Sequence, residues 1–271
     1  LLMDESLELS WHTGSAACNM QVAYRAVFEK VFDSACAKDV VFWGGSGGGF
    51  AALYFSYFFE GSTALVWNSQ TNILSYLPDA VGRYLNVAFG KNRDDFPAAF
   101  GSIEYDISRL YAGGYKNRVI YIQNDEDWHV GSHLSPLLDA IGVDVGSILS
   151  GSYEGLVAPN FYLFLGHFSK DHDPPSNREI HYALADCYAS RGDPSIFSFS
   201  RLINGHHGGH AAPGWIVDAL LDRRLAFFRS DWPHFRSVPA VTLESPNVIV
   251  LSTGLSIEAG IDGALDWTRG F

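Results

Sequence analysis

The sequence feature that most constrains the fold is a glycine-rich turn between two apolar segments. Residues 39–43 (DVVFW) form a short apolar run, residues 44–49 read GGSGGG, and residues 50–59 (FAALYFSYFF) are again almost wholly apolar. A short apolar run bounded by a charge and by glycines is typical of a strand buried on both faces of a parallel sheet. The longer run after the glycines predicts a buried helix. We therefore expect a strand, a sharp turn and a helix in this order.

The turn itself matches a pattern that carries chemistry. Gly44 to Gly48 fit G-x-S-x-G, which marks a nucleophile elbow when it lies between a strand and a helix. The elbow needs small neighbours, because a side chain on either flank of the serine would collide with the adjacent strand or helix. It lifts the serine hydroxyl above the sheet edge and aims the next backbone N–H at a developing oxyanion. We predict that Ser46 is a catalytic nucleophile and that Gly45 and Gly47 shape its oxyanion site.

Three other interpretations of the turn compete with a nucleophile. A phosphate-binding P-loop ends in Gly-Lys-Ser/Thr, and no lysine occurs in this turn. A dinucleotide fingerprint is nominally present, since Gly47, Gly49 and Ala52 fit G-x-G-x-x-A, but residues 67–70 (WNSQ) offer no acid for the ribose. The third interpretation is a plain glycine turn with no catalytic role. The serine nucleophile is the favoured prediction of the four.

Elements of alternating type are expected along the chain. Strands are predicted at 39–43, 63–67, 118–123 and 160–165, helices at 19–37, 50–59, 134–141 and 176–188, and the end of another strand at 1–3. Such alternation predicts a parallel sheet with helices on both faces. We therefore expect an α/β fold, doubly wound and α/β-hydrolase-like. Ligands of these folds lie outside the carboxyl ends of the strands, so the residues after each strand are the functional candidates.

Domain boundaries follow from where these elements lie. We predict a catalytic domain over 1–192 with a possible cap at 70–117, and a C-terminal extension over 193–271. Within the extension, a helix is expected at 215–228 and strands at 238–243 and 247–251. Only 45 residues precede Ser46, whereas several strands normally precede a nucleophile elbow. The chain is thus expected to be a fragment without its first strands, in which residues 11–14 would have to rebuild the second oxyanion donor.

A serine nucleophile requires an acid and a base, which follow in that order along an α/β-hydrolase chain. After the strand predicted at 118–123 comes NDEDWH, with three acids. Asp127 is the preferred acid, because it lies a short loop beyond the strand and beside an aromatic residue; Asp125 is the alternative. A solvated acidic turn is the interpretation without function. His129 and His133 are either substrate contacts or exposed residues.

Two histidines after the strand predicted at 160–165 compete for the role of base. His172 lies in a loop before a helix that begins after two prolines, an accessible place for proton transfer, whereas His167 lies closer to the strand. We prefer His172. Residues 205–210 (GHHGGH) look like a metal site, but no carboxylate or cysteine stands at ligand spacing. A histidine-rich loop is favoured there, with His207 and His210 as reserve bases, and no metal or cofactor is predicted.

Composition limits the partners. With 18 basic and 30 acidic residues the net charge is −12, which disfavours nucleic acid and anionic membranes as partners. No run of 18 apolar residues exists, so no membrane span is expected. Three cysteines without C-x-x-C spacing argue against a disulfide or metal framework. A cytoplasmic protein with a small-molecule or glycan ester substrate is expected.

Four segments in order add a family resemblance. The chain reads WGGSGGGFAALYFSYFF, VWNSQTNILSY, YIQNDEDWHV and then a histidine before a proline pair. Over residues 1–190 it resembles α/β-hydrolase-like proteins of bacterial polysaccharide and accessory-secretion loci. The resemblance implies a triad of Ser46, Asp127 and His172. It also implies that Gln70 and Asn72 form the floor of the site.

These observations lead to one favoured function and two alternatives. We expect a serine hydrolase of carboxylic esters that removes acyl groups from a carbohydrate, with Gly45, Gly47, Gln70 and His129 as oxyanion and substrate-binding residues. An acyltransferase would use the same triad with a sugar hydroxyl in place of water. A non-catalytic hydrolase-like module in glycan synthesis or secretion would use the many aromatic residues for sugar binding, although most of these are expected in the core.

Overall fold

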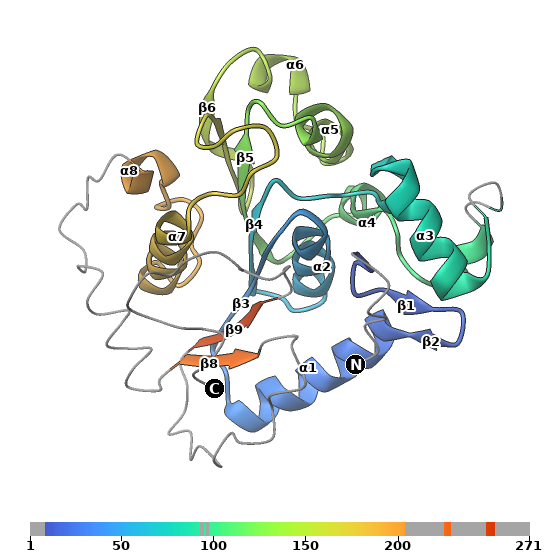
Figure 1. Ribbon diagram of the computed structural model, residues 1–271. Coiled ribbons are helices and arrows are strands. Elements are labelled where there is room, and N and C mark those ends of the chain that lie inside the picture. The colour runs from blue at the N-terminus through green and yellow to red at the C-terminus, as the bar shows by residue number, and fades with distance from the viewer. Residues whose placement is uncertain (1–8, 93–94, 96–97, 204–224, 229–247, 253–271) are drawn as a thin grey trace.

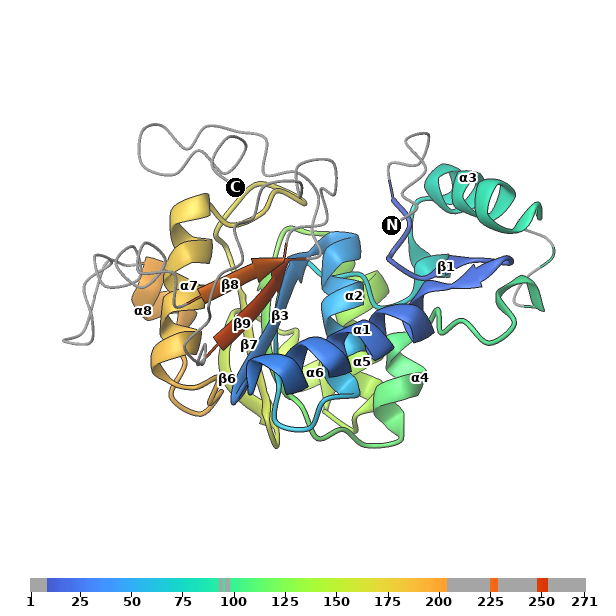
Figure 2. The same ribbon diagram turned by 90° about the horizontal axis from the view of Figure 1, so that it is seen from below.

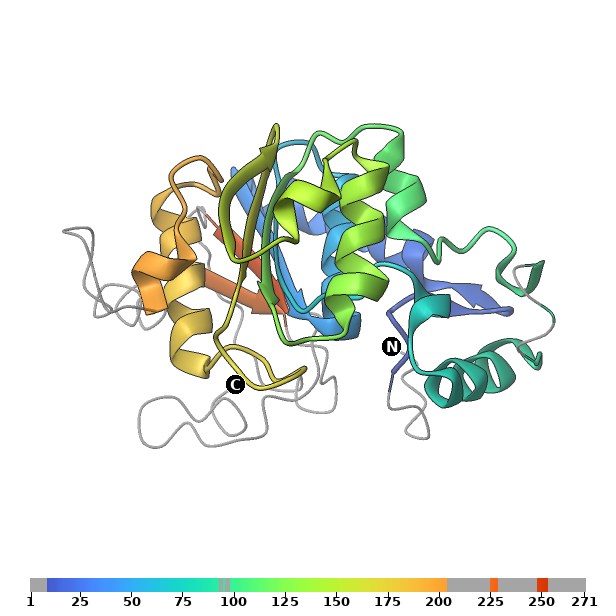
Figure 3. The same ribbon diagram turned by 90° about the horizontal axis from the view of Figure 1, so that it is seen from above.

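The protein is a layered α/β structure built around one mixed sheet. The structure, a computed structural model, describes residues 9–92, 95, 98–203, 225–228 and 248–252. Seven strands lie in the order β6-β7-β5-β4-β3-β9-β8, and a separate two-stranded hairpin pairs β1 with β2. All neighbouring pairs in the large sheet are parallel except β6 and β7. Helices flank the sheet on both sides (Figures 1, 2 and 3).

The strands are short, as expected for a buried parallel sheet. Their bounds are β1 Gly14–Ser15, β2 Cys18–Asn19, β3 Asp39–Gly45, β4 Thr63–Trp67, β5 Arg118–Asn124, β6 Tyr153–Ala158, β7 Phe161–Gly166, β8 Leu225–Phe228 and β9 Val248–Ser252. The helices are α1 Met20–Ala35, α2 Ser46–Tyr57, η1 Ile73–Ser75, α3 Pro78–Phe89, η3 Ala98–Phe100, α4 Ile107–Ala112, η4 Val130–Leu134, α5 Ser135–Ala140, α6 Val145–Ile148, α7 Asn177–Ala189 and α8 Phe199–Ile203.

Each face of the sheet carries its own apolar core. Successive side chains of a strand point to opposite faces, so Phe42 of β3 joins one cluster and its neighbours Val41 and Trp43 join the other. The first cluster lies under α1, α2, α4 and α5, and the second under α7 and α8. In Figure 2 these two groups of helices stand on opposite sides of the strands. The central strands are therefore covered on both faces, which explains their continuous apolar runs.

The predicted elements of the first 190 residues are largely confirmed. The strands predicted at 39–43, 63–67, 118–123 and 160–165 are β3, β4, β5 and β7, and the helices at 19–37, 50–59 and 176–188 are α1, α2 and α7. The helix predicted at 134–141 is α5, preceded by one wider helical turn, η4. The mostly parallel α/β sheet with helices on both faces is thus the observed architecture.

Several parts of the fold were not predicted, among them the short helices α6 and α8. The antiparallel strand β6 adds an edge beside β7, and the hairpin β1–β2 precedes α1. Residues 225–228, predicted to be the end of a helix, are strand β8, so that prediction is wrong there. The strand predicted at 247–251 is β9, which pairs with β3. The elements predicted at 1–3, 215–224 and 238–243 and the histidine-rich stretch at 205–210 lie outside the described residues.

The sheet does not stop at the strand that carries the glycine turn. β9 lies beside β3 on the side opposite β4, and β8 lies beyond β9. Helix α8 also comes from the region after residue 192, and its Phe199 and Leu202 join the second core cluster. Of the segment 193–271, the structure describes residues 193–203, 225–228 and 248–252, and the division of the chain at 192 stays a prediction. Within the described residues, no helix combines the length and the apolarity that crossing a bilayer requires.

Candidate active site

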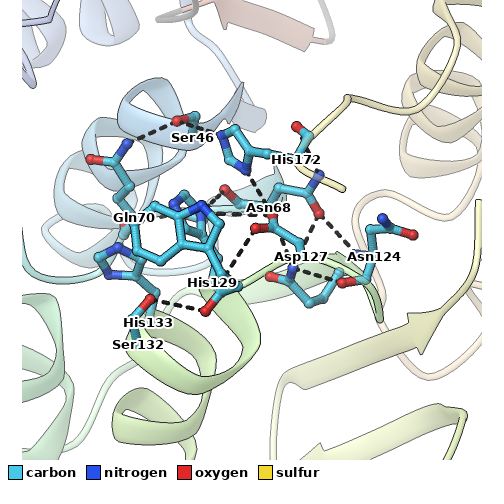
Figure 4. Close-up of polar contacts among 12 residues, drawn as sticks. Ser46, Asn68, Gln70, Asn124, Asp127, His129, Ser132, His133 and His172 are labelled. Atoms are coloured by element: carbon cyan, nitrogen blue, oxygen red, sulfur yellow. Dashed lines mark hydrogen bonds and ion pairs between the residues drawn. The ribbon is translucent and has the colours of Figure 1, made fainter. Parts of the chain in front are cut away.

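Four neighbouring parallel strands end at one edge of the sheet, and polar residues follow each of them. Ser46 follows β3, Asn68 follows β4, Asp127 lies three residues beyond β5, and His172 lies in the loop after β7. Because β3, β4, β5 and β7 are consecutive in the sheet, residues far apart in the chain come together at its carboxyl edge. Figure 4 shows these side chains converging.

Ser46, His172 and Asp127 form a continuous chain of hydrogen bonds. His172 Nε2 is 3.1 Å from Ser46 Oγ, and His172 Nδ1 is 2.7 Å from Asp127 Oδ2. An ionised carboxylate only accepts, so Nδ1 carries a proton and donates it to Asp127. The lone pair of a neutral imidazole then lies on Nε2 and faces the serine hydroxyl. This arrangement allows His172 to take a proton from Ser46.

The backbone at Ser46 has the conformation of a sharp elbow. Its φ angle is 51°, in the left-handed region that costs a residue with a side chain about 1 kcal/mol or more. Close packing explains the flanking glycines. A Cβ on Gly45 would lie 2.1 Å from Nε1 of Trp67, and one on Gly47 would lie 2.3 Å from Cδ1 of Leu9. Gly47 is also in the first turn of α2, where backbone N–H groups have no partner within the helix and suit an anion.

Asp127 is held in its charged form although it is buried. Only 2% of the residue is exposed. Burial alone would raise its pKa, but hydrogen bonds from His172 and from the backbone N–H of His129 outweigh burial, and the pKa is lowered. Nε2 of Gln123 also donates to Oδ2, at 3.3 Å. The carboxylate therefore stays ionised at neutral pH and orients the imidazole of His172.

Two asparagines at the strand ends hold the loop that carries His172. Asn68 Nδ2 donates to the carbonyl oxygen of Asp173 at 3.0 Å, while its Oδ1 accepts the backbone N–H of Asn124 at 2.9 Å. Asn124 Nδ2 donates to the carbonyl of Asp171 at 2.7 Å. Asp171 and Asp173 are the two neighbours of His172 in the chain. The asparagines that bind their carbonyl groups therefore fix the height of the imidazole above the sheet. Neither asparagine was predicted, although an asparagine at the end of a buried strand was the available signal.

His129 and His133 are buried behind the triad rather than exposed. Both are 0% exposed, so the interpretation of these two histidines as exposed residues is wrong, and the substrate contact of His129 stays a prediction. Nδ1 of His129 donates to the carbonyl of Asn68 at 2.9 Å, and Nδ1 of His133 accepts the N–H of Thr71 at 3.2 Å. The His129 ring packs edge-on against both His172 and His133, with centroids 4.2 and 4.4 Å apart.

Burial keeps both of these imidazoles neutral. The pKa of His129 falls to about 4, chiefly because burial penalises the charged ring and also because His172 lies beside it. Burial likewise lowers the pKa of His133 to about 3. The two rings thus form an uncharged backing for His172.

Gln70 makes direct contact with Ser46. Its Nε2 donates to Ser46 Oγ at 2.8 Å, and its Oε1 accepts the indole N–H of Trp11. Asn72, expected beside Gln70 in the floor of the site, instead caps η1, with Oδ1 accepting the N–H of Leu74 at 2.8 Å. Trp11 belongs to residues 11–14, which were expected to rebuild the second oxyanion donor, but its contact with Gln70 was not predicted.

The alternative acid and base lie apart from Ser46. Side chains of Asp125 and His167 are 37% and 62% exposed, and their nearest atoms are 3.7 Å apart. His167 also lies 3.6 Å from Glu126. These three residues form an exposed polar cluster, while Asp127 and His172 are the pair that reaches the serine. His207 and His210 lie outside the described residues.

A cleft of about 560 Å³ opens beside Ser46. Its walls come mainly from the stretch predicted as a cap, and they are Leu9, Tyr76, Leu77, Pro78, Asp79, Ala80 and Arg83. Just outside, Trp128 is 44% exposed and stacks on Tyr76 with centroids 5.8 Å apart. The cleft thus offers an apolar and aromatic wall next to the nucleophile, with one acidic and one basic residue on α3.

The same cluster contains a set of potential metal ligands. Asp127, His129 and His172 each present a ligand atom, and these atoms lie within 4.8 Å of one another. However, the Asp127 carboxylate and Nδ1 of His172 are hydrogen-bonded to each other, and Nδ1 of His129 is bonded to Asn68. Metal binding through these atoms would have to break those bonds, so the geometry fits proton transfer better than coordination.

Comparisons with known proteins give no independent assignment. No protein-family model matches the chain, and no curated protein matches it either.

Proposed function

We propose that this protein is a serine hydrolase that cleaves carboxylic esters. The observation that carries the proposal is the hydrogen-bonded chain from Ser46 through His172 to Asp127, with the serine on an elbow at positive φ. Position along the chain agrees, because the order nucleophile, acid, base is that of α/β-hydrolases. We also propose that the chain has the α/β-hydrolase fold. We propose further that it is related to the α/β-hydrolase-like proteins of bacterial polysaccharide and accessory-secretion loci.

The first half of the reaction forms an acyl-enzyme. Ser46 Oγ attacks the ester carbonyl carbon while its proton passes to His172 Nε2. The carbonyl oxygen becomes an oxyanion, and the N–H of Gly47 donates to it. Asp127 stabilises the imidazolium that has formed. When the carbon–oxygen bond of the ester breaks, His172 gives the proton to the departing alcohol.

The second half releases the acid and restores the serine. A water molecule gives a proton to His172 Nε2 and attacks the acyl carbon through a second oxyanion. The bond from that carbon to Ser46 Oγ then breaks, and the proton returns to the serine. An alcohol in place of water would give acyl transfer to a new ester. The triad is the same in both reactions.

The cleft suggests which esters fit. Tyr76 lines it beside Ser46, and the exposed Trp128 extends the aromatic surface. A flat aromatic ring can stack on the apolar face of a sugar ring. This supports an acyl group on a carbohydrate as the substrate, in agreement with the family resemblance.

A fluorophosphonate probe and p-nitrophenyl acetate test the proposal. We expect the probe to label the native protein at Ser46, and Ser46→Ala to lose labelling and to lower kcat about 10⁴-fold or more. Ser132→Ala removes a nearby serine whose hydroxyl only bonds the carbonyl of Trp128, and it should behave like the unmodified protein. Labelling that survives Ser46→Ala, or a native protein with no labelling and no ester turnover, would overturn the proposal.

Matched pairs of variants separate the triad from its neighbours. Asp127→Asn keeps the shape of the acid but removes its charge, and a loss of kcat of about 10⁴-fold is expected. Asp125→Asn is the control in the same loop. His172→Ala should be equally damaging, with His167→Ala as its control. Product analysis with and without an added sugar acceptor then distinguishes transfer to the sugar from hydrolysis.

A further inference from the structure

The proposed reaction needs more than one donor for its oxyanion. Two hydrogen-bond donors usually share this charge, and in α/β-hydrolases the second one comes from a loop after an early strand. The N–H of Gly47 provides one donor in this protein. The further inference rests on the proposed function and concerns the source of the other donor.

Gln70 lies beside the nucleophile and is anchored there by its own backbone. Its N–H donates to the carbonyl oxygen of Ser46 at 3.1 Å, and the residue is 0% exposed. The side-chain Nε2 donates to Ser46 Oγ at 2.8 Å. A primary amide carries two N–H groups, and the bond to Oγ uses one of them. The amide therefore carries a second hydrogen on the same nitrogen, 2.8 Å from Ser46 Oγ.

Trp11 determines which end of the Gln70 amide faces the serine. An indole N–H donates and never accepts, so its partner on Gln70 must be the carbonyl oxygen Oε1. The NH₂ end is thereby turned toward Ser46 (Figure 4). Without that contact, an amide oxygen facing Ser46 could accept a hydrogen bond from the hydroxyl and would repel an oxyanion.

The turn that carries Trp11 is itself well anchored. Trp11 is 1% exposed and packs edge-on against Tyr76 and Tyr84, with centroids 6.2 and 5.1 Å away. The Thr13 N–H donates to the carbonyl of Ser10 at 3.2 Å, and the Tyr84 hydroxyl donates to the carbonyl of Gly14 at 3.1 Å. A rigid support of this kind is what keeps a donor preorganised.

We propose that the Gln70 amide donates the second hydrogen bond to the oxyanion, and that Trp11 is the positioning residue that orients this amide. In the resting protein the amide donates to Ser46 Oγ. When Oγ bonds to the carbonyl carbon, negative charge develops on the oxygen one bond further away, and an N–H of the same amide donates to it. No covalent bond to Gln70 or Trp11 forms or breaks.

The first test replaces Gln70 and uses p-nitrophenyl acetate as the substrate. Gln70→Ala and the nearly isosteric Gln70→Glu, which cannot donate to Ser46 when ionised, should each lower kcat about 10²- to 10³-fold with little change in KM. Gln21→Ala is the control, because Gln21 is also a buried amide bonded to backbone but lies on α1. Its kcat should not change. Thermal melting shows whether each variant folds, and retained kcat in a folded Gln70 variant would overturn the proposal.

A transition-state analogue separates donation to the oxyanion from a loss of structure. A trifluoromethyl ketone adds to Ser46 and forms the same kind of oxyanion as the ester. Its inhibition constant should rise in the Gln70 variants by the same factor by which kcat/KM falls. A lower kcat/KM with unchanged inhibition would assign Gln70 a structural role instead.

The second test addresses Trp11 through a double-mutant cycle. Trp11→Phe keeps most of the packing but removes the indole N–H, and kcat should fall about tenfold, less than in Gln70→Ala. Combined with Gln70→Ala it should cause no further loss, because Trp11 acts only through that amide. Additive losses would overturn the positioning role. If the unmodified protein lacks Ser46-dependent labelling and turnover, the proposed function itself fails; loss of the Gln70 effect alone leaves it intact.

Discussion

The two imidazoles behind the triad stabilise the fold most when they are uncharged. His133 accepts the N–H of Thr71 through Nδ1, which requires its proton on Nε2. His129 has the opposite tautomer, because its Nδ1 donates to the carbonyl of Asn68. Within the described part of the chain, neither Nε2 atom has a hydrogen-bond partner. A second proton on either ring would lie on an Nε2 atom without a hydrogen-bond partner there and would place a charge in a buried site. This is costly, although Asp127 lies 3.8 Å from Nδ1 of His129.

This buried pair predicts how stability depends on pH. An unfolded histidine binds a proton near pH 6.5, whereas His133 and His129 bind one only near pH 3 and 4 in the folded protein. Stability is therefore complete above about pH 6.5 and is lost as the pH falls toward these folded-state pKa values. Each ring contributes up to about 1.4 kcal/mol per pH unit in that window.

His133→Asn tests this dependence. The asparagine Oδ1 replaces Nδ1 as acceptor for Thr71 but binds no proton, so the variant should lose less stability than the unmodified protein between about pH 6 and pH 5. Urea unfolding at the two pH values measures the difference. Equal losses in both proteins would show that His133 does not cause the acid sensitivity. His167→Asn, at an exposed histidine, serves as the control.

At the scale of elements, the elbow between β3 and α2 depends on the absence of side chains. Gly45→Ala would place a methyl group 2.1 Å from the Trp67 indole nitrogen. We expect a stability loss of about 1–3 kcal/mol from overpacking and a slower reaction of Ser46 with the fluorophosphonate, because the strand end must shift. Gly82→Ala in α3 is the opposite case, because no atom lies within 4 Å of its added Cβ. It should raise stability by about 0.5–1 kcal/mol. Thermal melting distinguishes the two, and equal melting temperatures would contradict this account.

Elements with a strong local signal were predictable from the sequence, and those defined by distant partners were not. The run 39–43 and the glycines after it specify β3 and its turn through composition alone. By contrast, β6 has the pattern YEGLVA with a glycine inside, and its pairing with β7 depends on a turn and a shared sheet edge. Residues 225–228 (LAFF) are an apolar run that fits a buried helix and a buried strand equally well. Their pairing with β9 makes them a strand.

The candidate site shows the same division. Ser46, Asp127 and His172 were selected because each follows a strand that ends at the same sheet edge. Among the described residues, no strand of the large sheet precedes Trp11, and the role proposed for it arises only when the turn before α1 packs against α3. Local sequence contains no signal for such a contact. Likewise, the burial of His129 depends on Tyr76 and Trp128, which pack on its ring from two different segments.

At the scale of the whole molecule, β3, the strand that leads into Ser46, pairs with strands from distant parts of the chain. β4 flanks β3 on one side and β9 on the other, with Val250 opposite Val41 in the parallel register. If β9 were lost, β3 would become an edge strand with unpaired backbone groups beside Ser46. The order of strands thus predicts that residues 248–252 stabilise the site although they are almost at the other end of the sequence.

Val250→Pro tests this long-range support. β9 lies between β3 and β8, so its backbone N–H groups face a partner strand on either side, and proline removes one of them. We expect a loss of about 3 kcal/mol, comparable to the cost of proline within a helix, and a lower rate of Ser46 labelling by the fluorophosphonate. Val250→Thr keeps the backbone N–H and the branched shape, and it should melt at a clearly higher temperature than the proline variant. If the two variants have the same melting temperature and the fluorophosphonate labels Ser46 equally fast in both, β9 does not support β3, and the sheet ends at β3.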